Sequence, residues 1–470
     1  MSKPATLPSE DSSSSFWHTE PKLLGHRSTE SLPQRVDVVV IGSGISGASV
    51  VHHIFNDFDN GEDANNPDVL VLEAREVCWG ATGRNGGHCL PILHEHPHDP
   101  SISSFEHANF LALSHLISTQ NISCEWNAQQ GIRGLYSDEE VTLAKAAVDA
   151  LHHTNPVMGK LCRVISDPDE LLKAGLSVPK AKGAVISDVA ARLWPYKLVT
   201  AIWERLLQDE RLNLQTHTPV LSISPSDHGT WTLQTSRGAI DAGKVILATN
   251  AYTSYLVPSM ADLIVPCRGQ MSALLPGSAF SGSSRTQRSY GFVGPHKDDY
   301  LIQRPDEKGA HLMFGGGRSF GPSLGISDDA EVDENVARYL RTALPRLLFS
   351  ANAEQKGEAE LQATHQWTGI MGFSRDNLPW VGEIPGSSGI FVLAGYTGHG
   401  MPNAWLCGKS VAAMVLASDV DAAVEKCVEQ GLPRAYLMTE ERMKKSRELD
   451  TVEVQDEGHA FRAEVVAEEA

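Results

Sequence analysis

The sequence predicts an α/β fold divided between two domains, and three observations support that prediction. The chain has 470 residues, more than one hydrophobic core usually organises. Largely apolar runs at 36–41, 69–72, 244–248 and 390–394 are rich in valine, isoleucine and leucine, which is typical of strands buried on both faces of a parallel sheet. The first run leads into a glycine-rich turn and an apolar segment at 48–55 that we interpret as a helix. This is the order of a right-handed βαβ unit.

The remaining elements are less regular. We expect helices at 196–207, 333–349 and 404–416, strands at 213–223 and 230–235, and a strand-like, glycine-rich stretch at 267–320. Helices and strands therefore alternate along the chain, as an α/β protein requires.

The composition excludes several classes of protein. The 39 lysine and arginine residues against 58 aspartate and glutamate residues give a net charge of −19, which disfavours a nucleic-acid partner. No apolar run is long enough to cross a membrane, and the polar residues 1–15 lack the apolar core of a signal peptide. The seven cysteines are scattered without a CxxC pair, which is typical of a reducing compartment. We therefore expect a cytoplasmic protein without a membrane span.

The strongest local motif is Gly42-x-Gly44-x-x-Gly47, between the first strand and the first helix. In that context the spacing is typical of a Rossmann-like dinucleotide site. The first glycine permits a tight turn, the second lets the backbone approach a pyrophosphate, and the third lets helix and strand pack closely. The N–H groups at the helix start then face the phosphate charge.

Glu73 ends the second strand, where its carboxylate can accept hydrogen bonds from both ribose hydroxyls of an adenosine. It lies 31 residues after Gly42, beyond the roughly 20 residues usual for this motif. The polar loop 56–67 accounts for the excess. An acidic residue here favours FAD or NAD over NADP.

Two further glycine-rich segments favour FAD over NAD. Residues 80–88 (GATGRNGGH) suit a longer cofactor, whose ribityl chain and ring must pass along the backbone. Residues 395–401 (GYTGHGM) lie between a buried strand and a helix, whose start could hold the electron-rich end of a reduced flavin. A single dinucleotide motif disfavours enzymes that hold FAD and NAD(P) in two Rossmann units. An NAD-dependent dehydrogenase stays an alternative, and it predicts a colourless protein.

Three more segments carry a resemblance to a known family. They read VILATNAY at 245–252, PCRGQ at 266–270 and GFSRDNLPWVG at 372–382. With the glycine motifs they resemble the FAD-dependent amine and amino-acid oxidases of the D-amino-acid oxidase, glycine oxidase and sarcosine oxidase superfamily. The segment 80–88 is most similar to the branch that contains γ-glutamylputrescine oxidase. The resemblance covers about residues 36–416.

The resemblance implies a FAD-binding Rossmann-like domain of the glutathione-reductase type. It also implies a second, α+β substrate domain, whose mixed or antiparallel sheet roofs the flavin. The expected partition is a mobile leader at 1–35, a discontinuous FAD domain at 36–100, 184–258 and 366–418, a substrate domain at 101–183 and 259–365, and a C-terminal helix with a charged tail at 419–470.

The resemblance also implies which residues hold FAD. The expected cofactor residues are Gly42, Ser43, Gly44, Ile45, Ser46, Gly47, Glu73, Ala74, Arg75, Ala81, Thr82, Gly86, Gly87, His88, Val220, Ala248, Thr249, Gly398, His399 and Gly400. The sarcosine oxidase branch attaches its flavin through a cysteine just before the segment 372–382, but residues 368–372 read TGIMG. We therefore expect noncovalent FAD, with a link through His88 as the alternative.

The expected reaction is oxidation of a C–N bond in an amine or amino acid. Hydride passes from the carbon beside the nitrogen to flavin N5, water hydrolyses the imine, and O2 is reduced to H2O2. This chemistry depends on positioning more than on a side-chain base, so no catalytic residue is assigned. An arginine fork would bind a substrate carboxylate. The preferred candidates for substrate binding are Arg304, Arg375, Tyr396 and His399, with Arg268 and Arg318 as further arginines.

Two alternatives keep the same fold. One is a dehydrogenase that passes electrons to a quinone or a protein acceptor, and the other is a flavin-binding protein without turnover. The expected partners of the oxidase are a small amine or amino acid and O2. Residues 94–98 (HEHPH) match the HExxH pattern of zinc enzymes, but Pro97 breaks the helix which that pattern requires, so no metal is expected.

Overall fold

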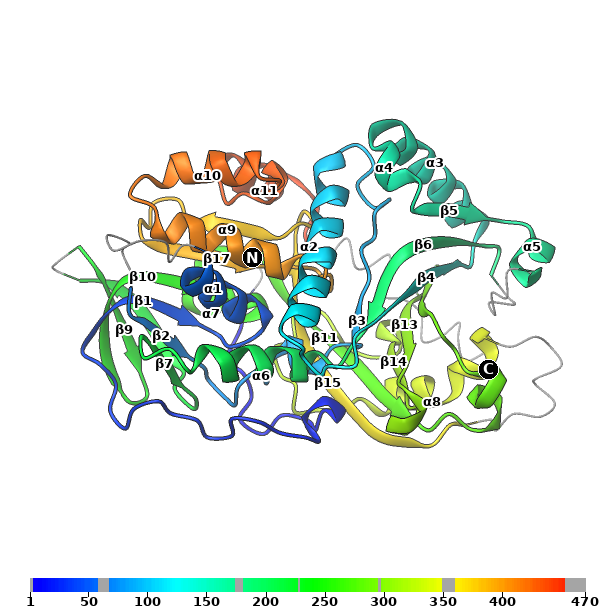
Figure 1. The fold of residues 1–470 in the computed structure, drawn as a ribbon, viewed down its shortest axis with the longest axis horizontal. Helices are drawn as coiled ribbons and strands as arrows, with labels where there is room; N and C mark the ends of the chain where they lie inside the picture. The colour runs from blue at the N-terminus through cyan, green and yellow to red at the C-terminus, as the bar shows by residue number, and fades with distance from the viewer. Residues whose placement is uncertain are drawn as a thin grey trace.

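The computed structural model describes residues 3–57, 67–173, 181–226, 229–294, 297–348 and 360–452. These residues form two lobes, each built on one sheet (Figure 1). Most of the polar loop 56–67 and the charged tail from residue 453 onwards lie outside the described residues.

The first sheet contains the four buried strands predicted from the sequence. Its strands are β1 (Arg35–Ile41), β2 (Val69–Leu72), β7 (Leu212–Gln215), β8 (Val220–Pro225), β9 (Trp231–Thr235), β10 (Gly238–Leu247), β16 (Trp380–Glu383) and β17 (Ile390–Ala394). The main path is β16-β17-β10-β1-β2-β7, in which all strands but the edge strand β16 run parallel. The hairpin β8–β9 extends from β10. This buried parallel sheet confirms the predicted α/β fold class.

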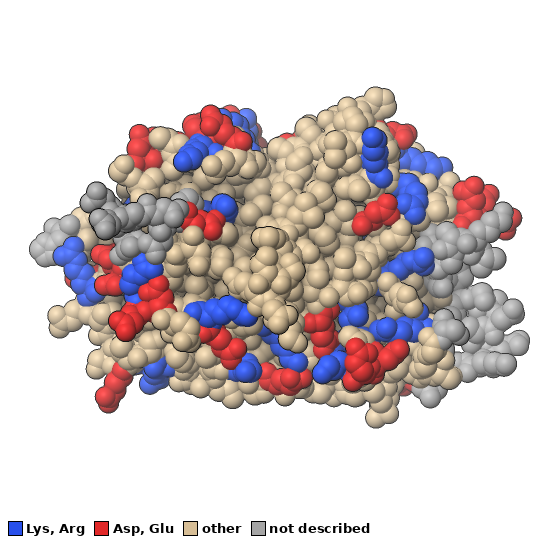
Figure 2. Space-filling view, viewed as in Figure 1, with Lys and Arg blue, Asp and Glu red and all other residues tan. Residues whose placement is uncertain are grey.

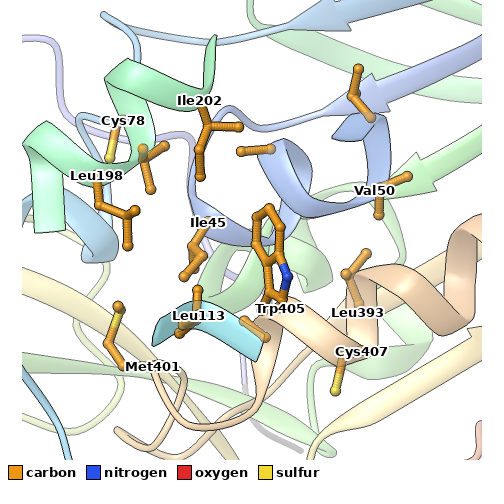
Figure 3. Packing of buried hydrophobic residues seen from close by; sticks show 14 of the residues in the cluster. Ile45, Val50, Cys78, Leu113, Leu198, Ile202, Leu393, Met401, Trp405 and Cys407 are labelled. Atoms are coloured by element: carbon orange, nitrogen blue, oxygen red, sulfur yellow. The ribbon is translucent and has the colours of Figure 1, made fainter. Parts of the chain in front are cut away.

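Helices cover the first sheet. They are α1 (Ile45–Asn56), α2 (Pro100–Thr119), α6 (Pro195–Leu206), α9 (Ala404–Leu416), α10 (Val420–Glu429) and α11 (Glu440–Glu448). Figure 3 shows Val50 of α1, Leu393 of β17 and Trp405 of α9 in one apolar cluster. A Cβ at Gly408 would lie 2.3 Å from Ser49 Oγ, so this glycine lets α9 approach α1 closely. The packing fixes the start of α1 relative to the sheet.

The second sheet forms the other lobe. Its strands are β3 (His88–Cys89), β4 (Asn127–Leu135), β5 (Cys162–Ile165), β6 (Gly183–Arg192), β11 (Ile264–Leu274), β12 (Ser289–Gly294), β13 (Lys297–Gln303), β14 (Leu312–Gly316) and β15 (Ala363–Ser374). The order is β15-β11-β14-β13-β12-β4-β6-β3, with β5 paired to β6. Within this second sheet, β4 and β12 are the only described strands that pair in parallel. The mixed sheet agrees with the expected α+β second domain.

The second lobe has its own helices, and short helices connect the elements of both lobes. The helices of this lobe are α3 (Asp138–Thr154), α4 (Pro156–Gly159), α5 (Pro168–Lys173) and α8 (Glu334–Leu348). The connecting helices are α7 (Thr253–Leu256) and the 3-10 helices Phe16–His18, Ala81–Arg84, Asn250–Tyr252, Pro258–Met260, Ser278–Phe280, Gly282–Ser284, Asp306–Lys308, Arg318–Phe320 and Arg434–Tyr436. None of the helices in the described part of the chain is long and apolar enough to cross a membrane.

Two boundaries differ from the expected partition. That partition places 184–258 and 366–418 in the FAD domain, yet β6 and β15 at their starts are strands of the second sheet. Helix α2, expected in the substrate domain, packs against α9 of the first lobe. An apolar run indicates that a strand is buried, but it does not indicate which of two sheets pairs with it.

The leader also differs from the expected mobile segment. Trp17, in the 3-10 helix Phe16–His18, is fully buried, and Trp194 Nε1 donates a hydrogen bond to its carbonyl oxygen at 2.8 Å. Further along, Arg27 forms a bridge with Gln215 at the edge of the first sheet. Burial of two adjacent aromatic side chains stabilises this packed conformation.

The surface over α2 is poor in charge. Figure 2 shows charged side chains spread around the rim of this face and few of them over its centre, where α2 lies in Figure 1. The helix has one acidic residue, Glu106, and that residue is buried. Its carboxylate points inward, toward the region between the lobes.

Candidate active site

A cavity of about 800 Å³ lies between the two sheets. Its walls come from the carboxyl ends of β1, β2 and β10 and from β11, β12, β13 and β15. Open α/β sheets bind their ligands at the carboxyl ends of the strands, and the volume is in the range of cofactor and substrate sites. This cavity is therefore the candidate active site.

The glycine turn at the end of β1 tolerates no side chain at its first and third glycines. Gly42 has a φ of 108°, and a Cβ there would lie 2.6 Å from the Ala248 carbonyl oxygen. A Cβ at Gly47 would lie 2.0 Å from the Gly42 carbonyl oxygen. Gly44 begins α1 without a side-chain cap, an arrangement that binds phosphate at helix N-termini.

Glu73 follows β2 and lines the cavity next to this turn. Its Oε2 accepts hydrogen bonds from Ser43 N at 3.0 Å and Ser43 Oγ at 2.6 Å, and its Oε1 accepts from Arg75 N at 2.9 Å. A carboxylate offers about four acceptor positions, so the geometry leaves room for about one ribose hydroxyl rather than the expected two. The carboxylate has a second task, which is to hold the glycine turn.

The segment 80–88 crosses the start of α1. Thr82 Oγ1 accepts a hydrogen bond from Ile45 N at 3.2 Å. A Cβ at Gly86 would lie 2.5 Å from the Tyr300 ring, so Gly86 lets β13 of the second sheet approach. His88 lines the cavity, and burial together with nearby His399 lowers its pKa to about 4. Its Nδ1 has no hydrogen-bond partner among the described residues, which leaves a buried polar atom for a ligand.

A histidine and a carboxylate meet at the same end of the cavity. His399 Nε2 lies 3.0 Å from Glu106 Oε1. Burial by itself lowers the pKa of His399, but the Glu106 carboxylate outweighs burial and raises that pKa above its ordinary value. Glu106 also accepts hydrogen bonds from Asn403 Nδ2 at 3.2 Å and from Ile92 N at 2.9 Å. This end of the cavity thus holds one histidine whose pKa is lowered, His88, and one whose pKa is raised, His399.

Sequence reasoning missed a second charged pair in the cavity. Arg133 Nη1 of β4 lies 3.0 Å from Glu95 Oε2, and both residues line the cavity. The Glu95 side chain is half exposed, and Arg133 is the main group that lowers its pKa to about 2. No pattern within one segment of the sequence indicates this contact, because Glu95 and Arg133 lie 38 positions apart. Arg318 also lines the cavity.

Most of the expected cofactor residues share this cavity. All of them line it except Gly47 and Gly87, which pack behind its wall. A Cβ at Gly87 would lie 2.6 Å from the Trp17 ring, so this position is tied to the leader rather than to the cavity. The other expected cofactor residues include the starts of α1 and β8, the end of β2 and the loop before α9, which together surround this cavity.

The expected substrate residues divide differently. Arg304 and Arg375 lie outside the cavity. Arg304 pairs with Glu125 at 2.7 Å, and Arg375 donates to backbone carbonyl oxygens at the end of α11. Each guanidinium joins two segments of the chain, which accounts for its burial. Tyr396 lines the cavity, but its hydroxyl lies at the start of α1, whereas His399 faces the charged end.

The residues fit a bound FAD. The glycine turn would receive the pyrophosphate, Glu73 the adenosine ribose, and the segments 80–88 and 398–400 the flavin ring. Three observations support this fit: the positions where a Cβ would clash, the remaining acceptor position of Glu73, and the unpartnered Nδ1 of His88. When bound, FAD would supply the electron-accepting group for oxidation of a substrate.

A parallel sheet with this glycine turn, facing a mixed sheet across one cavity, is the architecture of a flavin-dependent oxidoreductase. The model of the DAO family, described as FAD dependent oxidoreductase, matches residues 37–414. The chain therefore belongs to this family and is an FAD-dependent oxidoreductase.

Relatives of known name agree with this assignment. Gamma-glutamylputrescine oxidoreductase of Escherichia coli (strain K12) is 23% identical over 398 residues, which cover 81% of this chain and 83% of that protein. Glycine oxidase of Pseudomonas aeruginosa is 24% identical over 374 residues, covering 77% and 90%. The resemblance expected from the sequence is confirmed.

Solved structures confirm the fold. Glycine oxidase from Geobacillus kaustophilus has a TM-score of 0.65 at 18% identity, covering 82% of this chain and 95% of that chain. L-proline dehydrogenase from P. horikoshii has a TM-score of 0.65 at 21% identity, covering 86% and 100%.

Proposed function

We propose that this FAD-dependent oxidoreductase oxidises a C–N bond of a small amine or amino acid. The observation that carries the proposal is the pairing of opposite charges at one end of the cavity, Arg133 with Glu95 and His399 with Glu106. A substrate carboxylate can replace Glu95 as the partner of Arg133 as the substrate enters. The names of the relatives, an oxidoreductase of gamma-glutamylputrescine and an oxidase of glycine, support the same substrate class.

The chain's own residues have distinct roles in this proposal. Arg133 binds a substrate carboxylate through its guanidinium fork. Glu106 raises the pKa of His399, and the protonated form of His399 disfavours a second positive charge beside it, so it favours the neutral form of a nearby substrate amine. The neutral amine is the form whose C–H bond can be oxidised. The walls from both sheets hold the substrate and limit the access of water.

The proposed electron acceptor is O2, and the proposed product is H2O2. The seven cysteines lie within the described residues, where all are buried and none forms a disulfide, which supports a reducing compartment such as the cytoplasm.

The test is an anaerobic screen of the purified holoprotein. Amines and amino acids are added one at a time while the visible flavin absorbance is recorded, and we expect a member of one class to bleach it. Air is then admitted, and H2O2 is measured with a peroxidase-coupled dye. If the flavin absorbance bleaches without formation of H2O2, and an added quinone restores the absorbance, the protein is a dehydrogenase rather than an oxidase. Absence of bleaching by every compound would contradict the proposed substrate class.

A further inference from the structure

The family match begins at residue 37, but residues 7–18 line the cavity that would hold FAD or contact the residues behind its wall. Leu7 and Pro8 line it. Next to them, the Ser9 carbonyl oxygen accepts a hydrogen bond from Arg75 Nη1 at 3.2 Å. Arg75 lies two residues after Glu73, so Leu7 and Pro8 lie at the adenosine end of the cavity.

The same segment supports the turn at the other end. Ser15 Oγ donates a hydrogen bond to the Gly83 carbonyl oxygen at 2.9 Å, and Trp17 Nε1 donates to the Asn85 carbonyl oxygen at 2.6 Å. The Trp17 ring fills the space in which a Cβ of Gly87 would lie. These contacts fix the backbone of residues 83–87, which carries Gly86 and leads into His88.

A buried arginine behind this turn takes some of its hydrogen-bond partners from the segment and others from Trp79 and Thr368. Arg84 is 2% exposed, and it donates hydrogen bonds to the Ser13 carbonyl oxygen at 2.8 Å and to Ser12 Oγ. A buried guanidinium without partners is costly. The segment therefore completes a polar cluster directly behind the cavity wall.

We infer that residues 7–18 are part of the FAD site of this chain. Leu7 and Pro8 close the adenosine end, and Ser15 and Trp17 act as positioning residues that hold the turn 83–87 in place. This inference extends the site beyond the family-matched region, and it is independent of the substrate.

The test measures FAD affinity separately from stability. Apoprotein is titrated with FAD, the Kd is obtained from quenching of flavin fluorescence, and the Tm of the apoprotein is recorded. The variants are Ser15→Ala and a chain lacking residues 1–8. The matched control is Ser28→Ala, because Ser28 Oγ accepts a hydrogen bond from Leu214 N at 2.9 Å at the sheet edge, outside the cavity.

We expect Ser15→Ala and the shortened chain to raise the Kd for FAD by roughly fivefold to tenfold, and Ser28→Ala to leave it unchanged. Trp17→Phe is a second test of the same Kd, because it keeps a buried ring and removes the hydrogen-bond donor to the Asn85 carbonyl oxygen. An unchanged Kd in Ser15→Ala, Trp17→Phe and the shortened chain would overturn the inference. So would an equal loss of FAD affinity in Ser28→Ala, because that would reflect stability rather than position.

Discussion

The Glu106 carboxylate lies 3.0 Å from His399 Nε2 and links helix α2 to the loop before α9. Asn403 Nδ2 and Ile92 N also donate to Glu106, so two segments hold the carboxylate, the loop before α9 and the stretch around Ile92. Burial opposes a charge on His399, but Glu106 outweighs it and raises the pKa of the imidazole. Glu106 therefore favours the protonated form of His399 at the end of the cavity where Arg133 also lies.

The first prediction concerns Glu106→Gln and pH. Because the folded-state pKa of His399 is raised, the stabilisation from Glu106 is fully present below the unfolded pKa of about 6.5. It is lost as the pH rises through the folded value. The stability difference between the wild type and Glu106→Gln should therefore shrink with rising pH. Free energies of unfolding by urea, measured between about pH 5.5 and pH 9, check this, with the exposed Glu441→Gln as control. A difference that stays constant with pH would contradict it.

The second prediction concerns Arg133 and the substrate carboxylate. Arg133→Leu should raise the KM for a carboxylated amine on the order of 10-fold to 100-fold, because a charge-assisted hydrogen bond is lost. Amines without a carboxylate should be affected much less. Steady-state kinetics of both substrate types check this, with Arg163→Leu as control, since Arg163 pairs with Asp188 at the surface. Equal losses for both substrate types would argue against a carboxylate contact.

The fold and the glycine turn could be predicted because each rests on a local pattern. The strand, turn and helix at 35–56 are contiguous, and clashes within that unit dictate Gly42 and Gly47. The pair of Arg133 and Glu95 could not be predicted, because it joins residues 38 positions apart through the register of the second sheet. No periodicity of a single segment encodes such a meeting.

The sequence could not predict the contacts of the arginine candidates or the packing of the leader, for a related reason. Arg304 has the same sequence signature whether it binds a substrate or, as observed, Glu125. The leader is polar at most positions, and that composition hides the one aromatic pair at Phe16 and Trp17 that anchors it. Average composition indicates mobility, whereas a few buried side chains decide the conformation.

The third prediction concerns Gly42, the first glycine of the turn after β1. Gly42→Ala should prevent FAD binding and destabilise the chain, because the φ of 108° disfavours a side chain and a Cβ would lie 2.6 Å from the Ala248 carbonyl oxygen. The strain is on the order of 1–3 kcal/mol. Gly386→Ala is the control, because Gly386 also has a positive φ of 75° but lies outside the cavity, and a Cβ there meets no atom within 4 Å. Flavin absorbance of the purified variants and their urea unfolding check this. Full flavin content in Gly42→Ala would refute it.

The fourth prediction concerns the buried carboxylate of Asp329. Its oxygens lie 2.9 Å from Arg75 Nη1 and 3.4 Å from Arg84 Nε. Burial lowers the pKa of Arg84 to about 10, so this guanidinium stays charged at neutral pH and needs the counter-charge. Asp329→Asn leaves two buried cations without it and should cost about 3–5 kcal/mol of unfolding free energy. The exposed Glu425→Gln, which breaks a surface pair with Arg434, should cause no measurable change. Urea unfolding of both variants distinguishes the two cases. If Asp329→Asn lowers the free energy of unfolding by less than about 1 kcal/mol, its ion pairs are no stronger than those at the surface. The polar cluster behind the cavity would then contribute little to the stability of the fold.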